Sequence, residues 1–190
     1  MVYKICCDNG NYVMRISHSF HRSYTEIQSE MEFIETLSKG GASVALPIKS
    51  PNGLLVTKLE KNEPCFMVSL FSYMEGVMPN YEHTQSDIFW QEYGKSMGKV
   101  HSITKESSKN FNRKEYIKEN YIVRAEKYIG GADSFILDKL ADPIKVIESL
   151  SNSKEVYGLI HSDMHLGNLM IDDEGEIKIF DFDDACYVTL

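Results

Sequence analysis

Apolar and polar positions alternate along the first 75 residues in short stretches that are typical of β-strands. Two β-rich runs, VYKICC and YVMRIS, flank the turn-forming residues DNGN, and this pattern predicts a hairpin over residues 2–17. The segments VALPIKS, GLLVTKLE and PCFMVSLFSYM are further short extended runs with turn-forming residues between them. We therefore expect five strands in this part of the chain.

One helix interrupts this β-rich pattern, in the stretch SYTEIQSEMEFIETLSKGG. Ser23 is the expected N-cap, and Glu26 stands three residues later, as in a capping box. The pair Gly40 and Gly41 is expected to end the helix. The apolar positions recur at helical spacing, so we expect them to face the core: Ile27, Met31, Phe33, Ile34 and Leu37.

After residues 74–79 the apolar positions follow a helical period instead. The stretch SDIFWQEYGKSMGKVHSI, residues 86–103, predicts a helix with Ser86 or Asp87 as its N-cap. Its inward-facing positions would be Ile88, Phe89, Met97 and Val100.

Two more helices are predicted, over residues 114–129 and 134–150, and Pro143 is expected to break the second. From Tyr157 the pattern returns to strands, in the runs VYGLI, LMI and EIKIF. The predicted fold class is therefore α+β with two lobes. The β-rich N-terminal lobe would be residues 1–75, and the helical C-terminal lobe would be residues 76–190 and carry a hairpin.

Composition and charge narrow the class of protein. The chain is 43% hydrophobic and 25% charged, with a formal charge of −8 and no basic block, so we expect no nucleic-acid partner. The N-terminus lacks the features of a signal peptide, and no run approaches the roughly 18 apolar residues of a membrane span. The four cysteines form no C-x-x-C pair, which fits a reducing compartment. We therefore expect a cytoplasmic protein with no membrane partner.

The stretch HSDMHLGN, residues 161–168, concentrates polar side chains between two apolar runs. The loop DDEG joins the two strands that follow it, a length that suits a hairpin. Pairing Ile171 with Glu176 would place Asn168 opposite Ile179 and close to Asp181 at the open end. The loop before Asn168 contains Asp163, so we expect three polar groups at one point.

Two carboxylates and an amide oxygen are hard ligands, which suit Mg²⁺ and do not suit zinc. A carboxylate that does not bind the metal could accept a proton from an attacking hydroxyl. The set therefore has the outline of a phosphoryl-transfer site. Taken singly, Asp163 and Asn168 could instead cap a turn.

The pattern H-x-D-x-x-x-x-N, followed by a hairpin and D-F, resembles the protein-kinase-like catalytic core. The stretch HSDMHLGNLMIDDEGEIKIFDFDDA resembles the aminoglycoside phosphotransferase and choline kinase family in particular, as do YGKSMGKVHSI, YVMRIS and SEMEFIETLSKGG. The resemblance extends from about Tyr3 to Ala185. It implies a bilobal protein-kinase-like fold and the cofactors ATP and Mg²⁺. It also implies γ-phosphoryl transfer to a hydroxyl of a small molecule such as an aminoglycoside, choline or homoserine.

The resemblance assigns a role to each residue of the loop and hairpin. Asp163 would be the catalytic base that orients the acceptor hydroxyl, and His161 would brace the loop. Asn168 and Asp181 would hold the metal that bridges the nucleotide phosphates. Two acids follow, Asp183 and Asp184, and one of them could support the metal site. It is equally possible that both are solvated acids of a loop.

The N-terminal lobe would bind the nucleotide. Arg15 stands where many members of the family have lysine, and its guanidinium could bind phosphate oxygens. The alternative is that Arg15 is a cation at the edge of a strand with no role in phosphate binding. Glu30 would be the partner of Arg15, with Glu26 as the fallback. Residues 69–76 would form the hinge that contacts adenine. Within the hinge, Phe71 and Tyr73 are the residues expected to bind the nucleotide.

The remaining histidines and Cys186 are not expected to form a catalytic or metal site. His165 is expected to be an ordinary loop histidine, and His18, His21 and His83 surface residues. Cys186 is expected to be an inert thiol, since no basic neighbour would lower its pKa.

The family continues beyond both ends of this chain, with a phosphate-covering loop before it and helices after it, so we expect a truncated core. A protein serine/threonine kinase and a non-catalytic remnant are the alternatives to a small-molecule kinase. The sequence indicates neither the acceptor nor the oligomeric state.

Overall fold

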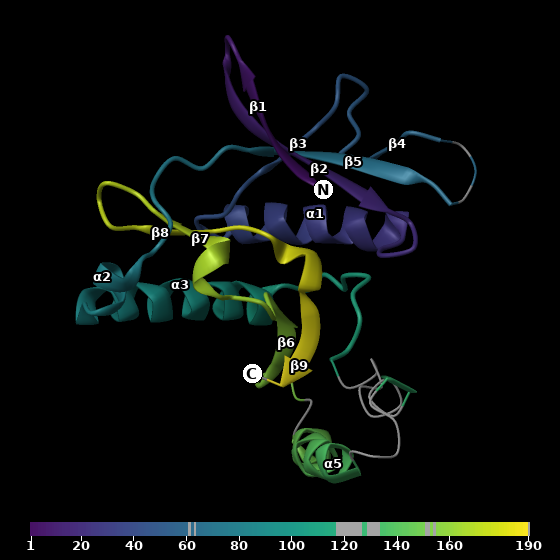
Figure 1. The fold of residues 1–190 in the computed structure, drawn as a ribbon, viewed down its shortest axis with the longest axis vertical. Coiled ribbons are helices and arrows are strands. Elements are labelled where there is room, and N and C mark those ends of the chain that lie inside the picture. The colour runs from purple at the N-terminus through teal and green to yellow at the C-terminus, as the bar shows by residue number, and fades with distance from the viewer. Residues whose placement is uncertain are drawn as a thin grey trace.

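The computed structural model describes residues 1–60, 62, 64–116, 127–128, 134–150, 153 and 155–189. The N-terminal sheet, helix α1 (Tyr24–Lys39), helix α3 (Asp87–Glu106) and the two-stranded sheet of β6 (Tyr157–Ile160) and β9 (Cys186–Thr189) are stacked in that order (Figure 1). Strands and helices both contribute, as the predicted α+β class requires. Each element before residue 73 lies within a segment where the sequence predicted it, whereas the short helix at Tyr81–Thr84 was not predicted.

The N-terminal sheet is antiparallel, with strand order β1-β2-β5-β3 and β4 also paired with β5. The predicted hairpin is confirmed, because Cys7 pairs with Gly10 across a two-residue turn. The bounds of the strands are β1 Val2–Cys7, β2 Gly10–His18, β3 Pro47–Ile48, β4 Thr57–Lys58 and β5 Phe66–Ser72.

Helix α1, Tyr24–Lys39, lies under this sheet (Figure 1). Its capping box is confirmed: the Glu26 N–H donates to the Ser23 hydroxyl, and the Ser23 N–H donates to the Glu26 carboxylate. The five apolar positions expected to face the core are all buried. At the end of α1, a Cβ on Gly40 would lie 2.6 Å from the Ile103 side chain, so glycine permits the close approach of α1 and α3.

Helix α3, Asp87–Glu106, follows the short helix α2, Tyr81–Thr84. Phe89 and Val100 are buried as expected and Met97 is half-buried, but the prediction for Ile88 is wrong, since 71% of that side chain is exposed. The buried face of α3 follows the spacing 89, 100, 103 and 104. Ile88 is turned about 100° from Phe89 around the helix axis and therefore lies outside that face.

Helix α5, Ser134–Ser149, contains Pro143 without a break, which corrects the expectation that proline divides it. The fixed φ of proline matches that of an α-helix, so the helix can continue with the loss of one hydrogen bond. In both views α5 stands apart from α1 and α3 (Figure 1). The helix predicted over residues 114–129 lies largely outside the described residues. Of its first residues, Glu115 forms a β-bridge with Tyr187 instead.

The described residues of the C-terminal half form two strand pairs. Strand β6, Tyr157–Ile160, pairs with β9, Cys186–Thr189, which the sequence pattern did not predict. Strand β7, Leu169–Ile171, pairs with β8, Ile177–Ile179, and forms the expected hairpin.

The register of that hairpin differs by one residue from the prediction: Ile171 pairs with Ile177, not with Glu176. The loop therefore has five residues. Its length follows from Asp172, whose Oδ1 accepts hydrogen bonds from the N–H groups of Glu174 (3.1 Å) and Glu176 (2.8 Å). Asn168 consequently faces Phe180, whose N–H donates to the Asn168 carbonyl.

The β7–β8 hairpin lies between two segments of the N-terminal half. Val77 bridges Ile171 on one side, and Val44 bridges Ile179 on the other. Gly76 has φ +134°, and a Cβ there would lie 2.4 Å from the Ile171 carbonyl oxygen. Backbone pairing thus fixes the hairpin against the segments that enter and leave the N-terminal sheet.

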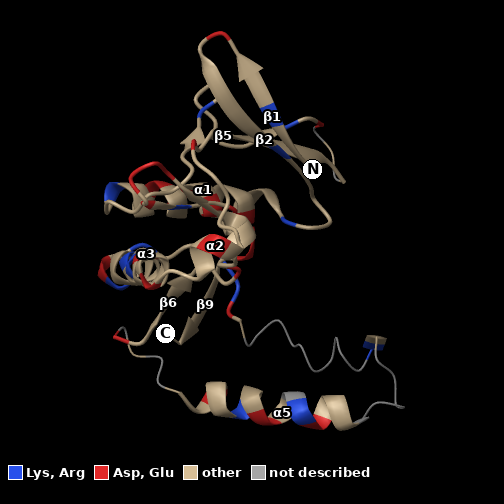
Figure 2. Ribbon diagram, turned by 60° about the vertical axis from the view of Figure 1, so that its left-hand side comes forward, with Lys and Arg blue, Asp and Glu red and all other residues tan. Residues whose placement is uncertain are grey.

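Aromatic side chains connect the layers of the core. Phe33 of α1 makes edge contacts with Phe111, after α3, and with Phe182, after β8. The buried apolar cluster is continuous across residue 75, and the division into two lobes there stays a prediction. Charged residues of both signs are interspersed along α3 and α5 (Figure 2). Within the described ranges, no helix combines the length and the apolar composition that a membrane span requires.

Candidate active site

His161 braces the loop that follows β6. Its ring is 3% exposed and packs on Phe182, with the ring centroids 4.4 Å apart. The Asp163 N–H donates to its Nδ1 (3.3 Å), so Nε2 carries the proton and donates to the Phe180 carbonyl (2.9 Å). Burial lowers the pKa of His161 below its ordinary value, which favours this neutral form. The ring therefore joins the start of the loop to the end of β8.

Asn168 connects the two ends of the same loop. Its Nδ2 donates to the Asp163 carbonyl (2.9 Å) and to Asp163 Oδ2 (3.2 Å), and the residue is 6% exposed. The Asp163 side chain remains 50% exposed. His165 lies 3.5 Å from Asp163 Oδ2, and its Nδ1 accepts from the Gly167 N–H. Asp163 is thus held in place while its carboxylate stays open to a ligand.

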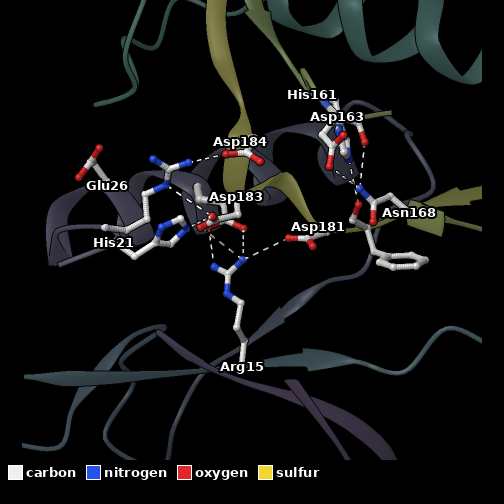
Figure 3. A network of polar contacts seen from close by, with 12 residues as sticks. Arg15, His21, Glu26, His161, Asp163, Asn168, Asp181, Asp183 and Asp184 are labelled. Atoms are coloured by element: carbon white, nitrogen blue, oxygen red, sulfur yellow. Dashed lines mark hydrogen bonds and ion pairs between the residues drawn. The ribbon is translucent and has the colours of Figure 1, made fainter. Parts of the chain in front are cut away.

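Asp181 has a left-handed backbone, with φ 63° and ψ 66°. This conformation is uncommon for a residue other than glycine, and it turns the chain sharply after β8. The Asp181 carboxylate is 50% exposed and lies 3.7 Å from Arg15 Nη1. Figure 3 shows Asp181 between Asp183 on one side and Asn168 on the other. The predicted gathering of Asp163, Asn168 and Asp181 is therefore present.

Arg15 and Glu30 form a bidentate ion pair, with nitrogen–oxygen distances of 2.8 and 2.6 Å. Arg15 is 9% exposed and Glu30 is fully buried, so the expected partner, and not Glu26, is the one that pairs. Burial is the largest influence on the pKa of Arg15 and lowers it, but nearby carboxylates outweigh burial and place the pKa above its ordinary value. The guanidinium is therefore charged, and the Nη1 that donates to Glu30 also lies near Asp181 and Asp183 (Figure 3).

His21 and Arg22 belong to this network, which corrects the expectation that His21 is an unconnected surface residue. His21 Nε2 lies 2.8 Å from Asp183 Oδ2, and Arg22 Nη2 lies 2.5 Å from Asp184 Oδ1. Burial alone would raise the pKa of Asp183, but the neighbouring cations outweigh it and hold that pKa below its ordinary value. One sequence signal existed: two basic residues stand just before the N-cap of α1, where a helix terminus disfavours cations.

The two residues assigned to the hinge differ in position. Phe71 is 8% exposed and lies inside the sheet, paired with Val13 of β2 and Pro47 of β3. Tyr73 follows β5, beyond the paired residues, with Lys4 Nζ 4.0 Å from the centre of its ring. Contact of either residue with a nucleotide stays a prediction.

Two cavities meet at Asp163. The first, of about 390 Å³, is lined by residues of β1 and β2 and by Arg15, Asp163, Asp181 and Asp183. The second, of about 550 Å³, is lined by the segment before α1, by Arg113 and by Asp163 among the catalytic-loop residues. Asp184 also lines both cavities, but its carboxylate is paired with Arg22. Asp163 is therefore the better-placed acid through which a ligand in one cavity could react with a ligand in the other.

Asp181, which lines the first cavity, and Asn168, which lies beside Asp163, form a donor set that fits a hard divalent cation. Asp181 and Asn168 offer a carboxylate and an amide oxygen, and among the described residues no group of three or more histidines, cysteines or acids is arranged to enclose a metal. Mg²⁺ is commonly held by one or two carboxylates together with water and substrate phosphates. Asp181 and Asn168 would thus bind Mg²⁺ together with water and substrate phosphates.

The sequence signature of the phosphotransferase enzyme family matches residues 2–189. The chain belongs to this family. The resemblance seen in the catalytic loop is thereby confirmed, and with it the protein-kinase-like fold.

Two relatives of the phosphotransferase enzyme family show how far the similarity extends. Amicoumacin kinase of Bacillus subtilis (strain 168) is 32% identical over 190 residues, which cover 98% of this chain and 56% of that protein. The structure of amicoumacin kinase hAmiN in complex with AMP-PNP, Ca²⁺ and Ami is 30% identical, with a TM-score of 0.91, and the match covers 99% of this chain and 57% of that one.

A microcompartment-associated aminopropanol kinase shares the fold at 20% identity, with a TM-score of 0.78. The match covers 98% of this chain and 62% of that one. The chain thus spans little more than half the length of these relatives.

Proposed function

We propose that this chain forms the nucleotide and catalytic region of a phosphotransferase that moves the γ-phosphoryl group of ATP to a hydroxyl of a small molecule. The position of Asp163 carries the proposal. Its carboxylate is half-exposed where two cavities meet, while Asn168 and His161 hold its backbone. A base placed between two binding spaces is what group transfer between two ligands requires.

Each residue of the site would act through its position. Asp163 would accept a hydrogen bond from the acceptor hydroxyl, orient it and take its proton. Asn168 and Asp181 would hold Mg²⁺, which when bound neutralises charge on the phosphate oxygens. Arg15, oriented by Glu30, would bind phosphate oxygens in the first cavity. Most of the rate would come from positioning and electrostatics.

Support for ATP and a divalent cation comes from the chemistry of the first cavity and from the relative whose structure contains AMP-PNP and Ca²⁺. We place the nucleotide there, with adenine near the main chain of Phe71 and Tyr73. The four cysteines form no disulfide with one another, which agrees with a cytoplasmic enzyme.

We place the acceptor in the second cavity, beside Asp163. The relatives are kinases of amicoumacin and of aminopropanol, so a small molecule with a hydroxyl group is the acceptor class that we propose. A screen of small alcohols and aminoglycosides against protein substrates separates this proposal from a protein kinase.

Calorimetry with the 190-residue chain tests the proposal, before any acceptor is known. We expect Mg²⁺-dependent ATP binding that Asp181→Ala weakens and Asp163→Ala leaves intact. In the acceptor screen, Asp163→Ala should abolish transfer. A well-folded wild-type chain that binds no Mg·ATP would refute the proposal for this polypeptide, and equal ATP affinity in the two variants would refute the division of roles.

A further inference from the structure

Arg113 is a partly buried arginine in the segment after α3, and no catalytic or ligand-binding role has been assigned to it above. Its guanidinium makes three hydrogen bonds, and all three end on main-chain carbonyl oxygens. Nε donates to Ala185 O (2.8 Å), Nη1 to Glu26 O (3.3 Å) and Nη2 to Asp183 O. All three nitrogens of the guanidinium therefore donate to the main chain.

Retaining a cation in this place is unfavourable in itself. Burial is the largest influence on the pKa of Arg113 and lowers it below its ordinary value, with Arg22 adding to the effect. The carboxylates of Glu30 and Asp183 act in the opposite direction. A smaller neutral side chain would avoid this desolvation, so the hydrogen bonds of the arginine and its attraction to these carboxylates offset the cost.

Two of the three carbonyls belong to the segment that follows Asp181. Phe182–Asp184 form the single 3₁₀ turn η4, directly after the left-handed Asp181. Side chains hold this turn from the other direction: Asp183 contacts His21 and Arg15, and Phe182 is buried. Arg113 supplies the main-chain contacts that the turn lacks, only two residues from Asp181.

The third carbonyl belongs to α1. Glu26 lies in the first turn of that helix, and Glu30, one turn further on, holds Arg15. Arg113 therefore connects the segment that carries Asp181 to the helix that fixes Arg15.

We propose that Arg113 is a positioning residue for the magnesium–nucleotide site, because it clamps residues 183–185 to the start of α1 and so sets Asp181 relative to Arg15. This inference rests on the proposed function for its effect on ligand binding. Its structural half, the ordering of residues 182–187 by Arg113, can be measured without a ligand.

The experiment compares Arg113→Gln and Arg113→Lys with the wild-type chain. Lys95→Gln is the matched control, because Lys95 is an exposed cation on α3 that pairs with Glu92. Hydrogen exchange read by mass spectrometry reports the protection of residues 182–187, with α3 as the internal reference. Calorimetry then measures ATP affinity with Mg²⁺ and in EDTA.

We expect Arg113→Gln to speed exchange in residues 182–187 by about tenfold or more, since two of the three lost charged hydrogen bonds end there. Exchange in α3 should stay unchanged, since none of the three ends on that helix. Mg²⁺-dependent ATP affinity should fall by about tenfold, while affinity in EDTA stays near the wild-type value. Arg113→Lys should be intermediate in both, because an ammonium keeps the charge but cannot reproduce the fork. Lys95→Gln should match the wild type.

Wild-type protection in Arg113→Gln, or faster exchange spread evenly over the chain, would overturn the inference. If Arg113→Gln does not fold, Arg113→Lys provides the test instead. Wild-type exchange of residues 182–187 in Arg113→Lys would then overturn the inference. A wild-type chain that binds no Mg·ATP refutes the proposed function instead, and the exchange measurements still decide whether Arg113 orders the segment.

Discussion

The side-chain amide of Asn168 donates to both the carbonyl oxygen and the carboxylate of Asp163, at 2.9 and 3.2 Å. The residue proposed to hold the metal thus also fixes the residue proposed as the base. A single side chain sets the geometry of two functions, so a change at Asn168 should affect both. This coupling leads to the first prediction.

Asn168→Asp should weaken Mg·ATP binding by roughly 10–100-fold, the range seen when an orienting partner at a metal site is lost. An aspartate cannot donate to the Asp163 carbonyl, and its charge would repel the Asp163 carboxylate. Asn52→Asp is the matched control, because Asn52 is exposed in a turn that is distant from Asn168 in the sequence. Calorimetry at fixed Mg²⁺ checks the result, and equal affinities in both variants would contradict it.

Glu30→Ala should destabilise the protein by about 3–5 kcal/mol, because it leaves the buried Arg15 guanidinium without its partner. Urea unfolding at neutral pH measures the free energy of unfolding. The double variant Arg15→Met with Glu30→Leu should recover most of that stability, since no charge is then buried alone.

The same double variant should not recover Mg·ATP binding, because the phosphate ligand is gone. A double variant that is as unstable as Glu30→Ala would argue against an unpaired charge as the cause. One that binds Mg·ATP normally would argue against the proposed role of Arg15.

Acid should destabilise the protein through His161. Burial depresses the pKa of His161 in the folded state, so the unfolded chain takes up the proton first as pH falls. The stability from neutral His161 is fully present above the unfolded pKa of about 6.5 and is lost progressively as pH drops toward the folded pKa. One such group changes the free energy of unfolding by at most about 1.4 kcal/mol per pH unit.

Urea midpoints between pH 7.5 and pH 5 measure this effect, with His161→Gln as the comparison. The variant should be less stable at pH 7.5 and should lose less stability on acidification. Parallel curves for the two proteins would exclude His161 as the titrating group.

Gly76→Ala should destabilise the protein by about 1–3 kcal/mol, because Gly76 has φ +134° and an added Cβ would collide with the Ile171 carbonyl. Gly98→Ala is the control: Gly98 lies inside α3 with no atom within 4 Å of an added Cβ. That change should stabilise by roughly 0.5–1 kcal/mol, as expected from helix propensity. Thermal unfolding distinguishes the two signs, and a neutral Gly76→Ala would contradict the close approach.

Much of the candidate site could be predicted from local patterns. Asp163 and Asn168 are five residues apart, and a hairpin brings Asp181 to the same end. The pairing of Arg15 with Glu30 followed from the resemblance to the family, not from periodicity. The register of the hairpin was missed by one residue, because Asp172 closes the loop through two hydrogen bonds that turn composition does not reveal.

The sequence by itself determined most of the elements and the catalytic loop, because periodicity, caps and turns depend on residues close along the chain. Tertiary structure alone decided that α3 buries Phe89 and exposes Ile88, and that His21 meets Asp183, 162 positions away. It also decided that Arg113 holds residues 183–185. These contacts join side chains to distant partners, often to main-chain oxygens that every residue carries, so no local pattern of residue types records them.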